Sequence, residues 1–211
     1  MNKCFTLCLL LPAAVASAAP ITGSLWAVPD AVAANAIFSS IPATAPDVTF
    51  QVNSPLNFTD PATVEAFLLS GGAFGITGSA AALSRPVSDG VTGTLILFTG
   101  MVTVTNGQQF TVTHDDGLTL TIGGLDVINI PGAHNPTLTT MTYSGPSGTL
   151  PFSLVYGECC SGEAVLQTSL NLQPAAPGGV PEPGTALLTG AAFAAIGLLR
   201  RRRSLRSRIG R

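Results

Sequence analysis

Short stretches rich in Thr, Val, Ile, Leu and Phe, separated by turn residues, run through residues 93–172 of this chain. β-Branched and aromatic residues favour strands, whereas Gly, Pro, Asn and Asp favour the turns between them. Leu118, Leu120 and Ile122 alternate with threonine, as expected for a strand with one buried face. Because several short strands spaced by turns are typical of sandwiches and barrels, the pattern predicts an all-β antiparallel domain.

Individual elements follow from the same pattern. Residues 93–105 read as a long strand, Asn106-Gly107 as a hairpin turn and residues 109–114 as its partner strand. Phe110, Val112 and His114 are expected on one face of that partner strand. Further strands are expected over 118–122, 125–130, 141–144, 151–156 and 164–172, with a loop over 131–139.

The region before Gly93 has a weaker pattern. Residues 48–52 and 56–59 read as strands, and residues 31–38 as either a helix or an edge strand. One short helix is expected over 62–70, with Asp60 as its N-cap and Pro61 at the first helical position.

Both ends of the chain read as targeting segments. Lys3, the apolar residues 4–16 and Ala16-Ser17-Ala18 form a signal peptide over residues 1–18 with a small-residue cleavage site. At the other end, a Pro/Gly/Ala linker over 174–180 leads to Pro181-Glu182-Pro183, the uncharged apolar residues 185–199 and four consecutive arginines. The arginines are Arg200, Arg201, Arg202 and Arg203.

The physics of the C-terminal segment predicts a short transmembrane stop. A full span needs about 20 apolar residues, and residues 185–199 supply fewer, but flanking arginines can extend the reach by snorkelling. Arginine clusters stay on the cytoplasmic side, so the body of the protein is expected outside. A permanent single-pass anchor is the alternative.

Residues 181–211 resemble the PEP-CTERM sorting signal of Gram-negative bacteria, with all three parts in order. The resemblance implies cutting near Pro181–Pro183 by exosortase, a membrane-embedded cysteine protease. It also implies localisation to the cell surface or the exopolysaccharide matrix.

Between the two ends, charge is strongly one-sided. Residues 19–183 contain Arg85 as their one Lys or Arg and all eleven Asp and Glu, a formal charge of −10. Such a body is not expected to bind nucleic acid or anionic lipid through charge. It attracts cations, or its acids serve only to keep an apolar domain soluble.

The sequence GMVTVTNGQQFTVTHDDGLTLTIGGLDV, residues 100–127, resembles the core of the PA14 domain. Residues 150–172 resemble the closing hairpin of that family. The resemblance covers residues 93–173 and leaves 19–92 as an N-terminal part of the β domain that departs from the pattern. It implies a β-sandwich that serves as a carbohydrate-binding or adhesive module.

The same resemblance implies a metal site. In the adhesin branch of the family, two aspartates joined by a cis peptide bind Ca²⁺ together with a sugar diol, and Asp115 and Asp116 match that pair. A further ligand comes from a later loop, here residues 157–162, where Glu158 stands in place of the usual Asn. Carboxylate oxygens suit Ca²⁺. The alternative is a plain tight turn with Gly117 at positive φ.

Cys159 and Cys160 are the two cysteines that follow the signal peptide. An exported compartment is oxidising, so a vicinal disulfide is expected, with intermolecular pairing or free thiols as alternatives. A zinc site with His114 and His134 is disfavoured because adjacent cysteines lack ligand spacing.

No enzyme signature is present: the chain lacks a G-x-S-x-G elbow, an H-E-x-x-H motif and a P-loop. The sequence therefore predicts an exported, non-enzymatic surface or matrix protein with a glycan-binding task. A purely structural matrix protein is the main alternative, and a secreted hydrolase is a remote one.

Overall fold

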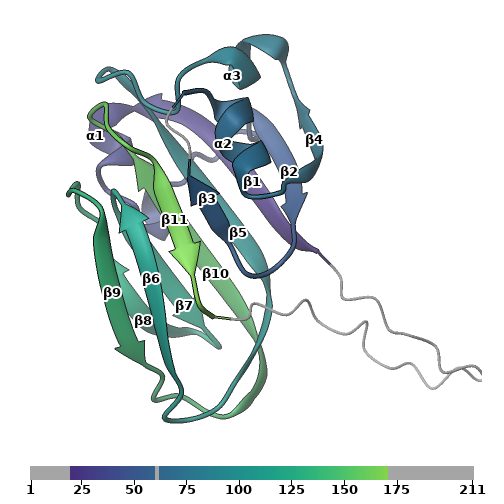
Figure 1. Ribbon diagram of the computed structural model, residues 1–211, viewed down its shortest axis with the longest axis vertical. Helices are drawn as coiled ribbons and strands as arrows, with labels where there is room; N and C mark the ends of the chain where they lie inside the picture. Colours follow the sequence, from purple (N-terminus) through teal and green to yellow (C-terminus); the bar gives the residue numbers. More distant parts are fainter. Residues whose placement is uncertain (1–19, 60–61, 171–211) are drawn as a thin grey trace, which may run out of the picture. The chain divides into compact units, whose positions relative to one another are not determined.

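The computed structural model describes residues 20–59 and 62–170 (Figure 1). The predicted signal peptide, linker, sorting motif, apolar segment 185–199 and arginine cluster all lie outside these residues. Within the described residues, no helix has the length and apolar character needed to cross a membrane. The described chain folds into two antiparallel sheets that pack face to face, as expected for the predicted β-sandwich.

The larger sheet has seven strands in the order β4-β2-β1-β5-β10-β7-β8. Its strands are β1 (Ile21–Pro29), β2 (Val48–Val52), β4 (Phe74–Gly78), β5 (Thr92–Val104), β7 (Leu118–Ile122), β8 (Leu125–Ile130) and β10 (Gly148–Glu158). β5 lies at the centre, between β1 and β10, with Trp26 opposite Leu95 and Leu154 opposite Phe98. Strands from before and after Gly93 therefore share one sheet.

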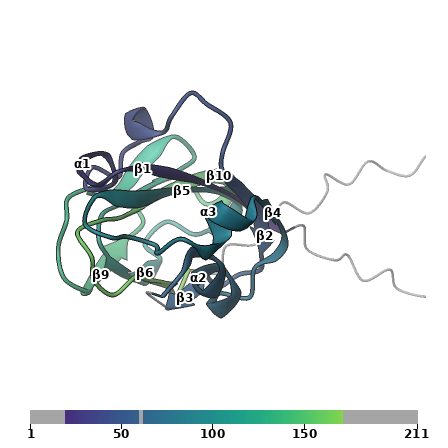
Figure 2. The ribbon, with the colours of Figure 1, turned by 90° about the horizontal axis from the view of Figure 1, so that it is seen from above.

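The smaller sheet has four strands in the order β3-β11-β6-β9. They are β3 (Asn57–Thr59), β6 (Gln109–Asp115), β9 (Thr137–Thr142) and β11 (Val165–Thr168). Figure 2 shows the two layers from above, with β1, β5 and β10 in one and β3, β6 and β9 in the other.

The main core fills the space between the sheets. Alternate residues face inward, so Leu25, Ile96 and Phe98 are buried in this core, while Trp26 and Leu95 face the other side of the larger sheet. There, Trp26 and Leu95 form a second, smaller cluster with the segment that contains Ala33 and Ala36. This cluster fixes the segment after β1 against the larger sheet, close to the end of β10.

Three short α-helices accompany the strands in the described part of the chain, where the sequence predicted one helix over 62–70 and either a helix or an edge strand over 31–38. They are α1 (Asp30–Ala33), α2 (Val64–Ser70) and α3 (Ala80–Ser84), with a 3₁₀ turn η1 (Phe38–Ser40). The predicted N-cap of α2 was wrong: the cap is Thr63, whose hydroxyl accepts a hydrogen bond from Ala66 N at 3.1 Å. Threonine caps well from an extended backbone, which is the conformation of Thr63.

The predicted hairpin at Asn106-Gly107 was also wrong, although its two strands exist. β5 belongs to the larger sheet and β6 to the smaller one, so this turn carries the chain between sheets. Gly107 has the positive φ of 82° that a tight turn needs. Its N–H, however, donates to the carbonyl oxygen of Tyr143, the residue directly after β9, and not to a residue of β5. β9 starts at Thr137, within the predicted loop.

Candidate functional site

The chain also crosses between the sheets at Asp115-Asp116-Gly117, between β6 and β7. β6 ends at Asp115 in the smaller sheet and β7 begins at Leu118 in the larger one. The Asp115–Asp116 peptide bond is cis, the form that the PA14 resemblance implied. Asp116 N donates to Gly157 O at 3.2 Å and Gly157 N donates to Gly117 O at 3.0 Å, so the crossing is fixed alongside the end of β10.

Gly117 does not have the positive φ that the plain-turn alternative required. What this position requires instead is the absence of a side chain, since a Cβ would overlap the carbonyl oxygen of Pro131. That oxygen is itself held by a hydrogen bond from Ala36 N at 3.0 Å. The crossing is therefore packed closely against the loop that follows β8.

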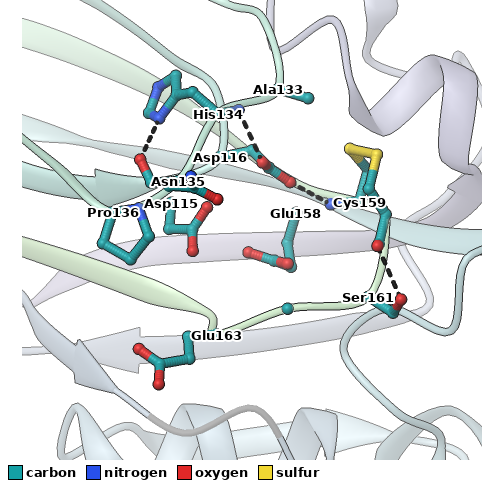
Figure 3. A pocket seen from close by; sticks show the side chains of 12 residues that line it. Asp115, Asp116, Ala133, His134, Asn135, Pro136, Glu158, Cys159, Ser161 and Glu163 are labelled. Atoms are coloured by element: carbon teal, nitrogen blue, oxygen red, sulfur yellow. Dashed lines mark hydrogen bonds between the residues drawn. A yellow bond between two sulfur atoms is a disulfide. The ribbon is translucent and has the colours of Figure 1, made fainter.

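A cavity of about 520 Å³ opens beside this crossing (Figure 3). Three segments line it: the crossing itself, the β8–β9 loop of residues 131–136, and the β10–β11 loop of residues 159–164 together with the end of β10. We call this cavity the acidic pocket. Its lining consists of Asp115, Asp116, Ala133, His134, Asn135, Pro136, Glu158, Cys159, Cys160, Ser161, Gly162 and Glu163.

Asp116 links the three segments through its carboxylate. One oxygen accepts a hydrogen bond from His134 N at 3.0 Å and the other from Cys159 N at 2.8 Å. The carboxylate therefore fixes the β8–β9 loop and the β10–β11 loop relative to the crossing. Because each oxygen keeps further lone pairs, Asp116 can still act as a metal ligand.

Asp115 and Glu158 are buried carboxyl groups on the same pocket, with 6% and 1% of their surface exposed. Burial, followed by the charge of Asp116, raises the pKa of Asp115 to about 6. Burial, again followed by the charge of Asp116, raises the pKa of Glu158 to about 9. In the metal-free protein at neutral pH, Glu158 is therefore a neutral carboxylic acid.

Tyr156 connects the two carboxyl residues beneath the pocket. Its hydroxyl hydrogen-bonds the backbone carbonyl of Asp115 and lies 3.0 Å from Glu158 Oε2. A phenol has one proton and a carbonyl only accepts. When Glu158 is protonated, the acid can donate to the phenol oxygen while the phenol donates to the carbonyl, and all three groups are satisfied.

His114 supports the crossing from the core side. It is fully buried, and its Nδ1 lies 2.7 Å from the backbone oxygen of Asp116 while its Nε2 lies 3.0 Å from Thr139 Oγ1. Since the carbonyl only accepts, Nδ1 carries the proton and Nε2 accepts from the threonine. Burial lowers the pKa of His114, in keeping with this neutral form. The residue therefore holds the turn rather than facing a substrate.

The β10–β11 loop contains a disulfide between Cys159 and Cys160. The sulfurs lie near the Asp116 carboxylate, but sulfurs bonded to each other offer no thiolate for a metal. With this disulfide formed, Cys159 and Cys160 cannot serve as the thiolate ligands of a zinc site. Cys159 is buried in the small cluster with Trp26, whereas Cys160 is exposed at the pocket.

Asp115, Asp116 and Glu158 all line the acidic pocket. Their carboxylate oxygens do not all lie within 4.8 Å of one another, since among the described residues the group that meets this spacing is Asp116 with Cys159 and Cys160.

Two further residues line the pocket that the sequence did not assign to a calcium site: Glu163, which is exposed, and His134. The ring of His134 packs edge-on against His114, with centroids 4.7 Å apart. No sequence motif marks either residue.

The chemistry of the pocket lining, rather than its spacing, is what suits a hard cation such as Ca²⁺. Asp115, Asp116 and Glu158 offer carboxylate oxygens, which Ca²⁺ prefers in a flexible shell. Among the described residues the lining has no Lys or Arg. Arg85, the one such residue between positions 20 and 170, donates to the carbonyls of its own segment and to Thr94 Oγ1.

Comparison with solved structures identifies the fold. The PA14 sugar-binding domain from an RTX adhesin aligns with a TM-score of 0.51 and 20% sequence identity, over 72% of this chain and 89% of that one. The PA14 domain of the MpAFP antifreeze protein aligns with a TM-score of 0.47 and 23% identity, over 76% of this chain and 83% of that one. No protein-family model and no curated protein matches the sequence. The chain has a PA14-like β-sandwich fold with an acidic pocket at one end.

Proposed function

We propose that this protein is an exported carbohydrate-binding or adhesive module that binds its glycan through Ca²⁺ in the acidic pocket. The observation that carries the proposal is the convergence of three buried carboxyl groups, Asp115, Asp116 and Glu158, on one open pocket without a cationic side chain. Burying several carboxylates together is costly unless they are protonated or share a cation. The aligned PA14 domain of the RTX adhesin is a sugar-binding domain, which supports the same task for this chain.

Each residue has a defined part in this proposal. Asp115 and Asp116 would hold the ion from the crossing, and Glu158 would hold it from the end of β10 after losing its proton. Bound Ca²⁺ supplies coordination positions that vicinal sugar hydroxyls can fill. Asp116 additionally keeps the two flanking loops in place through its bonds to His134 N and Cys159 N.

A glycan array read with Ca²⁺ and again with EDTA tests this function. The expected result is binding to a subset of glycans that EDTA abolishes and added Ca²⁺ restores. Asp115→Asn removes one charged ligand and should lose that binding, whereas Asp126→Asn, on the exposed face of β8, should retain it. A folded protein that binds no glycan under any condition would favour the alternative, a structural matrix protein without a ligand.

We also propose that residues 181–211 are a sorting signal processed by an exosortase-type protease at the inner membrane. The order of Pro181-Glu182-Pro183, the apolar residues 185–199 and the arginine cluster supports this route to the cell surface or matrix. Mass spectrometry of protein released from cells should find a C-terminus near residues 181–184. Released protein that still carries the arginines would contradict processing, and protein that stays in the membrane fraction would favour the permanent anchor.

A further inference from the structure

The β10–β11 loop takes its shape from residues that lie far from it in sequence. The backbone N–H of Cys160 donates to Asp30 Oδ2 at 2.9 Å, across 130 positions of the chain. The next N–H, that of Ser161, donates to Ser88 Oγ at 3.0 Å, and Ser88 Oγ in turn lies 3.5 Å from Asp30 Oδ1. Asp30 and Ser88 thus form one network that holds two consecutive amides of the loop.

The two hydrogen-bonded amides belong to residues with an unfavourable backbone conformation. Cys160 and Ser161 have φ values of 67° and 54°, the left-handed region that residues with a side chain rarely adopt. Such conformations persist when the surrounding structure fixes them. The disulfide constrains Cys160 on one side, while Asp30 and Ser88 provide the hydrogen-bond partners from outside the loop.

Asp30 and Ser88 are themselves held firmly. Asp30 opens α1, directly after β1, and its N–H donates to Val91 O at 3.0 Å, which joins it to the segment that carries Ser88. Gly93 lies directly beside this network: a Cβ there would meet both Asp30 Oδ1 and the carbonyl of Glu158. The network is therefore packed against the end of β10 and not merely extended over the surface.

The network holds part of the acidic pocket's own wall, because Cys160 and Ser161 line the pocket. Cys159, which precedes the two anchored amides, donates its N–H to Asp116, and Glu158 stands directly before it. Cys160 and Ser161 themselves line the pocket, and Glu163 lines it two residues further along the loop (Figure 3). Any change in the conformation of Cys160 and Ser161 consequently moves the pocket wall.

We infer that Asp30 and Ser88 are positioning residues that hold the β10–β11 loop in the conformation that forms the ligand pocket. This inference rests on the proposed function for its consequence in binding, but the effect on the loop itself is independent of any ligand. It assigns a task to the N-terminal part of the domain, which lies outside residues 93–173, where the sequence resembles PA14. That part completes the site without contributing a ligand to it.

The test compares Asp30→Ala, Ser88→Ala and the conservative Asp30→Asn with a matched control, Asp47→Ala. Asp47 also accepts a hydrogen bond from a backbone N–H, that of Ala27 at 2.8 Å, just beyond the β1–β2 pairing rather than in the loop. Hydrogen exchange of the peptide that spans residues 157–163 is measured in EDTA. Calcium affinity is measured by calorimetry, and thermal stability in EDTA serves as the control for folding.

Asp30→Ala and Ser88→Ala should speed exchange in the loop about tenfold or more and weaken calcium affinity about tenfold, the range seen for residues that orient ligands. Asp30→Asn keeps an oxygen acceptor and should restore most of both. Asp47→Ala should leave both unchanged even if it lowers thermal stability. Loop exchange that stays at the wild-type rate in both alanine variants would overturn the inference. If the wild-type protein binds no calcium, that result contradicts the proposed function instead. The exchange data would still decide whether Asp30 and Ser88 hold the loop.

Discussion

At the residue scale, the acidic pocket depends on carboxyl groups whose protonation differs from that of free acids. In the metal-free protein, Asp115 and Glu158 keep their protons to higher pH than the unfolded chain does, because both have raised pKa values. Between the ordinary and the raised pKa, the folded state binds more protons. The contribution of these two groups to the free energy of unfolding is therefore fully present at acidic pH and is lost as the pH rises through the raised pKa values.

The variant Glu158→Gln isolates this effect for one residue. Glutamine mimics the protonated acid and can still donate a hydrogen bond to Tyr156 Oη. In EDTA at pH 5 the wild type and the variant should have similar free energies of unfolding. From about pH 5 to pH 9 the wild type should become less stable than the variant by a few kcal/mol, because a pKa change of one unit corresponds to about 1.4 kcal/mol.

Chemical denaturation at several pH values measures this difference. A difference between wild type and Glu158→Gln that stays constant from pH 5 to pH 9 would show that Glu158 ionises normally in the folded protein. Taking the difference also cancels the opposite contribution of His114, whose lowered pKa makes the folded state less stable in acid.

The second residue-scale prediction concerns the close approach at Gly117. Gly117→Ala should destabilise the protein by about 1–3 kcal/mol, since the new methyl group meets a backbone oxygen that cannot rotate away. Gly132→Ala in the neighbouring loop is the control: its φ is not positive and its Cβ would meet open space. That variant should change stability by no more than about 0.5 kcal/mol. Equal unfolding midpoints for the two variants would contradict the packing described here.

At the element scale, several strands could be predicted from the sequence and their pairing could not. Residues 118–122 alternate regularly and form β7, and residues 48–52 form β2. The turn at Asn106-Gly107, however, has the same local chemistry whether the next strand pairs with the first or crosses to the other sheet. Pairing is decided by long-range packing, which local turn residues do not specify.

The same limit applies to the site. Asp115, Asp116 and Glu158 could be predicted because two short stretches resemble a known motif. Asp30 and Ser88 could not, since their role exists only once α1 and the segment before β5 are folded against the β10–β11 loop. β1 was missed for a related reason: Leu25 and Trp26 face opposite sides and both are buried, so the regular alternation that begins at Ile21 breaks in the middle of the strand.

The disulfide gives the element-scale prediction. Cys159 and Cys160 should be oxidised in the exported protein, since the compartment is oxidising and no other cysteine remains after residue 18. Alkylation under denaturing conditions followed by intact mass should show no modified thiol, and non-reducing electrophoresis should show a monomer. Two alkylated cysteines, or a reducible dimer, would contradict the intramolecular bond.

At the scale of the whole molecule, charge, targeting and the site are consistent with one another. Residues 19–183 contain all the acids, and every arginine except Arg85 lies at the C-terminal end, so the body between the two predicted targeting segments has a formal charge of −10. A strongly acidic body attracts divalent cations, and Ca²⁺ is available outside cells. The sandwich then provides one end where three segments, far apart in the sequence, meet around carboxyl groups.

Thermal unfolding with and without Ca²⁺ decides whether the acidic pocket binds the ion. An ion that binds only the folded state stabilises it by about 2.7 kcal/mol at a hundredfold excess over Kd, which raises the melting temperature by about 5 °C or more in a domain of this size. Millimolar Ca²⁺ should produce this rise, EDTA should reverse it, and Mg²⁺ should do less because it demands a tighter shell. Asp116→Asn should remove most of the shift, while Asp126→Asn should keep it. If the melting temperature of the folded wild-type protein does not change with Ca²⁺, that result contradicts a calcium site. Asp115-Asp116-Gly117 would then be only a structural crossing between the two sheets.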